Sequence, residues 1–67
     1  MDRREKKLEK LIRLEEVKAQ IGFGRSFIYA AIKDGNFPAP VKVGRHAVAW
    51  RQSEIDGWIA ERPRAAL

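Results

Sequence analysis

A chain of 67 residues forms one domain at most, and a chain of this size buries only about 60% of the surface that it exposes when unfolded. We therefore expect a thin core and no deep enzyme cleft. The absence of cysteine excludes disulfides and thiolate metal sites and suits a reducing cytoplasm. No apolar stretch approaches the roughly 20 residues that cross a bilayer, and residues 1–10 lack the apolar region of a secretory leader.

Positive charge is concentrated in the middle of the chain. The net charge is +5, from 14 Lys and Arg against 9 Asp and Glu. Residues 17–52 hold six basic residues and one acidic residue, Asp34, whereas the flanking segments nearly balance. A concentrated positive surface favours a polyanion such as nucleic acid, although composition alone also allows a basic protein with no such partner.

The N-terminal part predicts a tail and a small strand. Residues 1–10 alternate in the sign of their charge, and only Leu8 is apolar after Met1, so we expect a flexible, solvated, charged tail. An apolar cluster that can pair as a short strand follows, formed by Leu11, Ile12 and Leu14.

A first helix is expected at about residues 15–21. Val17 and Ile21 are four residues apart and share one helix face. Its N-cap is poor, because Arg13 or Leu14 stands where Ser, Thr or Asp is preferred.

A glycine turn separates this helix from the next. Gly22 can adopt the left-handed conformation that ends a helix, and Gly24 is a weak N-cap. Phe23 between them is expected to be buried. A three-residue turn between two helices is typical of a helix-turn-helix.

The second helix is predicted from about Arg25 to Asp34, with Gly35 as its stop. One face, at helical spacing, is apolar and should enter the core: Ile28, Ala31 and Ile32. The opposite face carries small or polar side chains behind Arg25, namely Ser26, Tyr29, Ala30 and Lys33. Phe27 falls on the flank, where the pattern does not place it.

This outward face suits the major groove of DNA. Ser26 and Ala30 are small enough for a close approach to base edges, and Arg25 can reach guanine N7 and O6. Tyr29 and Lys33 suit phosphate contacts, with a core-edge Tyr29 and a merely solvated Lys33 as the alternatives.

A two-stranded hairpin is predicted at residues 41–50, after an extended proline-containing segment at 36–40. Its loop is expected to be Gly44–Ala47, with Arg45 and His46 at the tip. Arg45 suits a narrow minor groove, His46 and Lys42 suit the DNA backbone, and an exposed arginine without a role is the alternative.

The last helix is expected to open at Ser53, with Asp56 completing a capping box, and to end by about Arg62 before Pro63. Its apolar stripe consists of Ile55, Trp58 and Ile59. Both tryptophans, Trp50 and Trp58, are expected in the core rather than as stacking platforms.

Catalytic, cofactor and metal sites are not expected. The one histidine, His46, has no neighbouring carboxylate in sequence to orient it as a base. The glycines do not form a phosphate-binding loop, and ligands at metal-binding spacing are lacking.

Residues 12–62 resemble the AlpA family of small phage and prophage regulators, which are similar to excisionases and to the winged DNA-binding domain of MerR-type regulators. The segments that carry the resemblance, together with a Trp-x(7)-Trp pattern, are Arg13–Val17, Gly22–Tyr29, Lys33–Pro38, Pro40–Gly44, Ala47–Trp50 and Ser53–Ile59. Two positions depart from the family pattern: Gly24 replaces a capping serine, and Phe27 replaces a smaller residue, often threonine.

The resemblance implies a mainly α winged helix-turn-helix at residues 11–62, between tails at 1–10 and 63–67. It implies a cytoplasmic, sequence-specific DNA-binding transcriptional regulator, with an excisionase-like recombination factor as the alternative. A protein-interaction adaptor without specific DNA binding is the competing class. The expected partner is double-stranded DNA; a second copy on an adjacent site and a recombinase are candidates, and a membrane is not.

Overall fold

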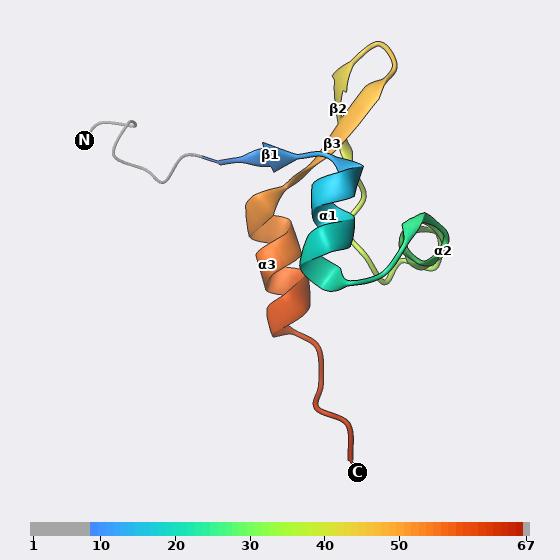
Figure 1. Cartoon of the computed structure of the whole chain (residues 1–67), viewed down its shortest axis with the longest axis vertical. Helices are drawn as coiled ribbons and strands as arrows, with labels where there is room; N and C mark the ends of the chain where they lie inside the picture. The colour runs from blue at the N-terminus through green and yellow to red at the C-terminus, as the bar shows by residue number, and fades with distance from the viewer. Residues whose placement is uncertain (1–8, 67) are drawn as a thin grey trace, which may run out of the picture.

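A computed structural model describes residues 9–66 (Figure 1). The predictions for residues 1–8 lie outside this range. Three helices and three short strands follow one another as β1 (Leu11–Ile12), α1 (Leu14–Ile21), α2 (Arg25–Lys33), β2 (Val41–Gly44), β3 (Ala47–Arg51) and α3 (Gln52–Ala60). This architecture confirms the predicted mainly α, winged helix-turn-helix fold.

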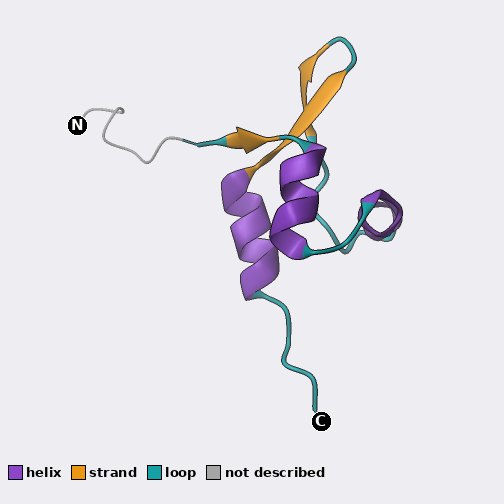
Figure 2. Ribbon diagram, in the orientation of Figure 1, coloured by secondary structure: helices purple, strands orange, loops and turns teal. Residues whose placement is uncertain are grey.

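The sheet joins the N-terminal strand β1 to the β2–β3 hairpin. Its order is β1-β3-β2, with both pairings antiparallel, so β3 lies in the centre. Figure 2 shows α1 and α3 next to each other below the strands, whereas the β2–β3 hairpin projects away from the helices. The amides of Gln20 on α1 and Gln52 on α3 exchange two hydrogen bonds of 3.0 and 2.7 Å, which fixes this helix pair.

Six buried apolar side chains form a single small core. Five elements and the loop after α2 contribute one side chain each: Ile12, Val17, Ile28, Phe37, Trp50 and Ile55. Trp50 is its largest fully buried member, and its indole N–H donates to the carbonyl of Pro38 at 2.9 Å. Trp58 is only half-buried; its indole N–H donates to the Asn36 carbonyl at 2.7 Å, and its ring meets Phe37 edge-on. Both tryptophans therefore hold the proline-containing segment after α2 against the body.

The start of α3 differs from the predicted capping box. The helix begins at Gln52, so Ser53 lies inside its first turn. Asp56 accepts a hydrogen bond from the side-chain amide of Gln52 at 2.9 Å. The cap comes from outside the helix. The Glu9 carboxylate accepts hydrogen bonds from the Ser53 N–H at 3.2 Å and from the Ser53 hydroxyl at 2.8 Å. A carboxylate at this end of a helix satisfies free N–H groups and the positive end of the helix dipole.

Three further local predictions are wrong. Phe23 is 52% exposed, because the turn that follows Gly22 directs it onto Phe27 rather than into the core. Ile59 is 41% exposed, because the core ends at Ile55 and Trp58 on this helix. The hairpin turn has two residues instead of four, since Gly44 still pairs with Ala47.

The glycines allow a test of this backbone. Gly22 has φ +80°, and Gly57 lies inside α3; at both positions an added Cβ would meet no atom within 4 Å. We expect Gly22→Ala to destabilise the protein by about 1–2 kcal/mol, because alanine is strained in the left-handed backbone conformation that Gly22 adopts. We expect Gly57→Ala to stabilise it by about 0.5–1 kcal/mol, because glycine disfavours a helix interior. Urea unfolding of both variants checks the signs, and two changes of the same sign would contradict these assignments.

Candidate nucleic-acid interface

The outward face of α2 is available to a ligand along its whole length. Ile28 is fully buried and anchors the helix, and Ala31 and Ile32 pack against the core, as predicted. On the other side every side chain predicted to contact DNA is exposed: Arg25, Ser26, Tyr29, Ala30 and Lys33. Figure 1 shows α2 nearly end-on beside α1, so one whole side of this helix lies clear of the other elements.

Tyr29 links this helix to the base of the hairpin. Its ring meets Trp50 of β3 edge-on, with ring centroids 6.3 Å apart, and the Arg25 guanidinium lies 5.0 Å from the Tyr29 ring centre. Tyr29 is 36% exposed, so it lies at the edge of the core and still presents part of its surface outward. The two alternatives considered for Tyr29 are therefore compatible, and Tyr29 positions Arg25 through a cation–π contact.

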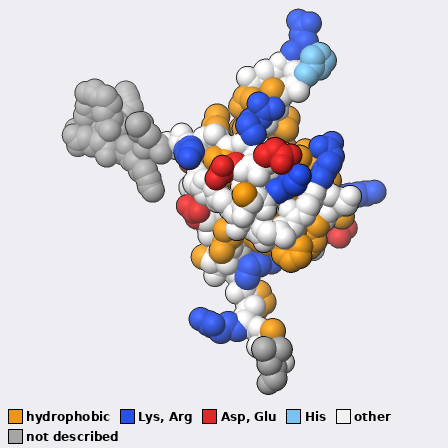
Figure 3. Space-filling model, viewed as in Figure 1, with side chains coloured by type: hydrophobic (Ala, Val, Ile, Leu, Met, Phe, Trp, Pro, Cys, Tyr) orange, Lys and Arg blue, Asp and Glu red, His pale blue; other side chains and the backbone are white. Residues whose placement is uncertain are grey.

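The hairpin carries the other predicted residues. Arg45 and His46 form its turn and are exposed, and Figure 3 shows the single histidine and a basic side chain at the tip. Lys42 pairs with Val48, and paired residues in adjacent strands point to the same face of a sheet. Lys42 therefore lies on the face that also carries Trp50, which is the face that Tyr29 of α2 contacts. Between Lys42 and Gly44 the register shifts, so the pairing of β2 with β3 is irregular just before the tip.

The two elements form one basic surface. The eight residues predicted from the sequence are all exposed, four of them are Lys or Arg, and none is acidic. Tyr29 contacts Trp50 on the sheet face that also carries Lys42, while Arg45 and His46 lie farther out at the hairpin tip. Lys and Arg side chains follow the hairpin and the α2 side of the molecule in Figure 3.

Sequence reasoning missed two features near this surface. Trp50 was expected as a core residue only, yet it also holds Tyr29. Phe23 and Phe27 form a stacked pair on the surface, with ring centroids 4.3 Å apart. The two residues are four positions apart, a spacing that brings side chains together on a helix. Because the glycine turn indicated a break in the helix at this point, the contact was not predicted.

Other kinds of site have less support in the described part of the chain. Residues 9–66 contain no group of three or more His, Asp or Glu side chains that could hold a metal ion. None of the helices within that range is long and apolar enough to span a bilayer.

Fold and surface together define a small winged helix-turn-helix protein with an exposed basic helix and hairpin. The family model described as prophage CP4-57 regulatory protein (AlpA) matches residues 10–63, and the chain belongs to this family of phage-type regulatory proteins. The chain is also similar to the uncharacterized protein ORF88 of Enterobacteria phage P4, with 43% identity over 54 residues. That match covers 81% of this chain and 61% of the phage protein, so the chain spans less than two thirds of this relative. No solved structure was found to match.

Proposed function

We propose that this regulatory protein binds specific double-stranded DNA, with α2 in the major groove and the β2–β3 hairpin on the adjacent backbone or minor groove. Arg25, Ser26 and Ala30 contact base edges, because an arginine and two small side chains suit that approach. The residues assigned to phosphates or to the narrow groove are Tyr29, Lys33, Lys42, Arg45 and His46.

One observation carries this proposal: the outward side of α2 and the neighbouring hairpin expose four Lys and Arg side chains and no carboxylate. Such a surface attracts DNA phosphates, and these electrostatic contacts supply most of the affinity of nonspecific DNA binding. The function proposed is binding, not catalysis, in the cytoplasm where the DNA of a phage or prophage lies.

The size of the domain further suggests paired sites. A single recognition module buries about 600–1,000 Å² on DNA, so one copy binds weakly by itself. We propose that copies bind adjacent or repeated sites. The same contacts serve transcriptional regulation and an excision-directing role in recombination.

A fluorescent-duplex titration at several salt concentrations tests the proposal. The logarithm of the binding constant should fall linearly with the logarithm of salt concentration, with a slope of about −0.9 for each neutralised phosphate. A site selected from random duplexes should outcompete random DNA. Binding without a salt slope, or a library that yields no enriched site, would contradict specific DNA binding and favour the adaptor class.

A further inference from the structure

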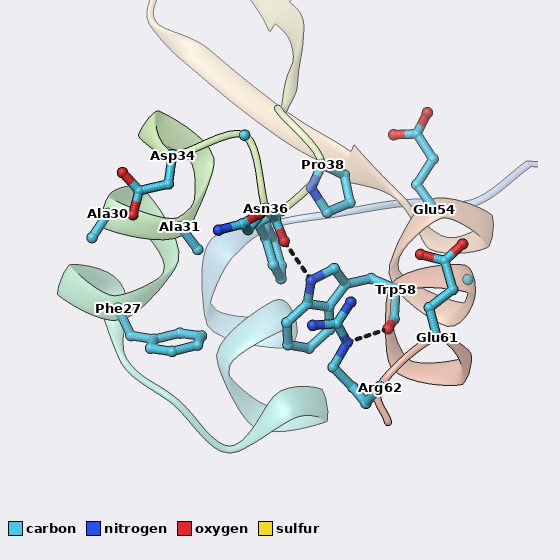
Figure 4. A pocket seen from close by; sticks show the side chains of 13 residues that line it. Phe27, Ala30, Ala31, Asp34, Asn36, Pro38, Glu54, Trp58, Glu61 and Arg62 are labelled. Atoms are coloured by element: carbon cyan, nitrogen blue, oxygen red, sulfur yellow. Dashed lines mark hydrogen bonds between the residues drawn. The ribbon is translucent and has the colours of Figure 1, made fainter. Parts of the chain in front are cut away.

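The flank of α2 that faces away from the hairpin borders a groove of about 920 Å³ (Figure 4). Phe27 and Tyr29 precede and follow buried Ile28, so at about 100° per residue they lie on opposite flanks of the helix. Tyr29 faces Trp50 and the hairpin, whereas Phe27 lines the groove together with side chains of α3. The groove thus uses a different side of α2 from Arg25 and Tyr29.

The groove has a mixed lining, in which an apolar group lies between polar and charged side chains. Phe27 and Ala31 of α2, Phe37 and Pro38 of the following loop and Trp58 of α3 contribute to its lining. Phe27 is 41% exposed and stacks on Phe23, which is 52% exposed, so the apolar surface continues beyond the groove onto the turn between α1 and α2. Exposed apolar patches with polar rims mark sites where proteins associate.

The charge of the groove is opposite to that of the chain. Three of its lining residues are acidic, namely Asp34, Glu54 and Glu61. Its one basic lining residue, Arg62, is turned back onto Trp58: the guanidinium lies 4.2 Å from the indole ring centre, and Nε donates to the Trp58 carbonyl at 2.9 Å. Figure 4 shows Asp34 on the α2 side and Glu54 and Glu61 on the α3 side. A net negative groove on a protein of net charge +5 repels DNA phosphates and attracts a basic ligand.

We propose that this groove docks a short segment of a partner protein that presents an apolar anchor side chain next to arginine or lysine. The anchor packs against Phe27 and Trp58, and its basic neighbours face the carboxylates of the rim. Phe27 lies on the flank of α2 opposite Tyr29, and the groove meets the proposed DNA-binding side of the helix at Ala30, which is part of its lining. Charge complementarity of this kind fixes the register of a partner and excludes acidic segments.

A displayed library of random 12-residue peptides, screened against the full chain without DNA, tests this proposal. We expect enriched peptides with Leu, Ile, Phe or Trp beside Arg or Lys. A labelled peptide of the enriched sequence should bind Phe27→Ala and Glu61→Arg at least tenfold more weakly than the wild type. Glu15→Arg is the matched control, because it makes the same charge change at an exposed position of α1 and should leave peptide binding unchanged.

Several outcomes would overturn the proposal. These are no enrichment, an acidic consensus, or equal binding of the peptide by Glu61→Arg and Glu15→Arg. A concentration-dependent dimer in sedimentation that Phe27→Ala abolishes would also overturn it, since a second copy would then fill the groove. The screen contains no DNA, so its failure is independent of a failure of DNA binding, and circular dichroism of each variant verifies that it is folded.

Discussion

Replacing Trp50 with alanine is expected to leave a large fraction of the protein molecules unfolded at room temperature. Trp50 is fully buried in a core of six residues, and it pairs with Ile12 across the sheet. Removing a buried tryptophan costs about 3–5 kcal/mol, while a domain of this size has roughly 3–10 kcal/mol of stability. The same change removes the hydrogen bond to Pro38 and the ring that supports Tyr29.

Urea unfolding followed by circular dichroism measures this loss, and Trp58→Ala is its control. Trp58 is the same residue type but is only half-buried, so its replacement removes less packing and should cost clearly less. A Trp50→Ala protein within about 1 kcal/mol of the wild type, or a greater loss in Trp58→Ala, would show that the core is centred elsewhere.

Replacing Arg25 with alanine is expected to weaken binding to a selected DNA site by about 5- to 150-fold, which corresponds to about 1–3 kcal/mol for a bidentate base contact. Binding to random DNA should weaken much less. Arg25 is exposed at the first turn of α2, and its guanidinium lies over the Tyr29 ring, which limits its orientations. Such an ordered arginine loses less entropy when it binds a base edge.

Lys42→Ala is the comparison that separates the two kinds of contact. Lys42 is exposed on β2, and a phosphate contact there predicts equal losses on specific and random duplexes, with a salt slope smaller by about 0.9. Fluorescence anisotropy at matched salt concentrations measures all four values. If Arg25→Ala and Lys42→Ala reduced specific and random binding in the same ratio, the assignment of Arg25 to a base would be wrong.

Local patterns in the sequence predicted most of the fold. The spacing of Ile28, Ala31 and Ile32 fixed the inner face of α2, and Gly22 and Gly35 both adopt the positive φ expected where the helices end. Alternation and turn residues predicted the hairpin, because both are properties of neighbouring residues. The exposure of the five candidates on α2 follows from its helical periodicity, and that of Arg45 and His46 follows from their place in the turn.

Contacts between distant parts of the chain were not predictable from such patterns. The cap that Glu9 gives to Ser53 joins residues 44 positions apart, and no local rule distinguishes it from the apparent capping box at Asp56. The exposed Phe23 is a similar case. A phenylalanine between two glycines indicates burial only when the direction of the turn is known, and that direction depends on how α2 packs. The groove of Phe27 and Trp58 arises from this packing too.

An NMR titration of the labelled protein with a duplex that carries its selected site measures which residues contact DNA. If α2 and the hairpin bind DNA, the backbone amide shifts of residues 25–33 and 42–47 should change most, and those of residues 54–61 on α3 should change little. The largest changes on α3 and around Trp58, with α2 and the hairpin unaffected, would contradict this account and place the DNA on the acidic groove face.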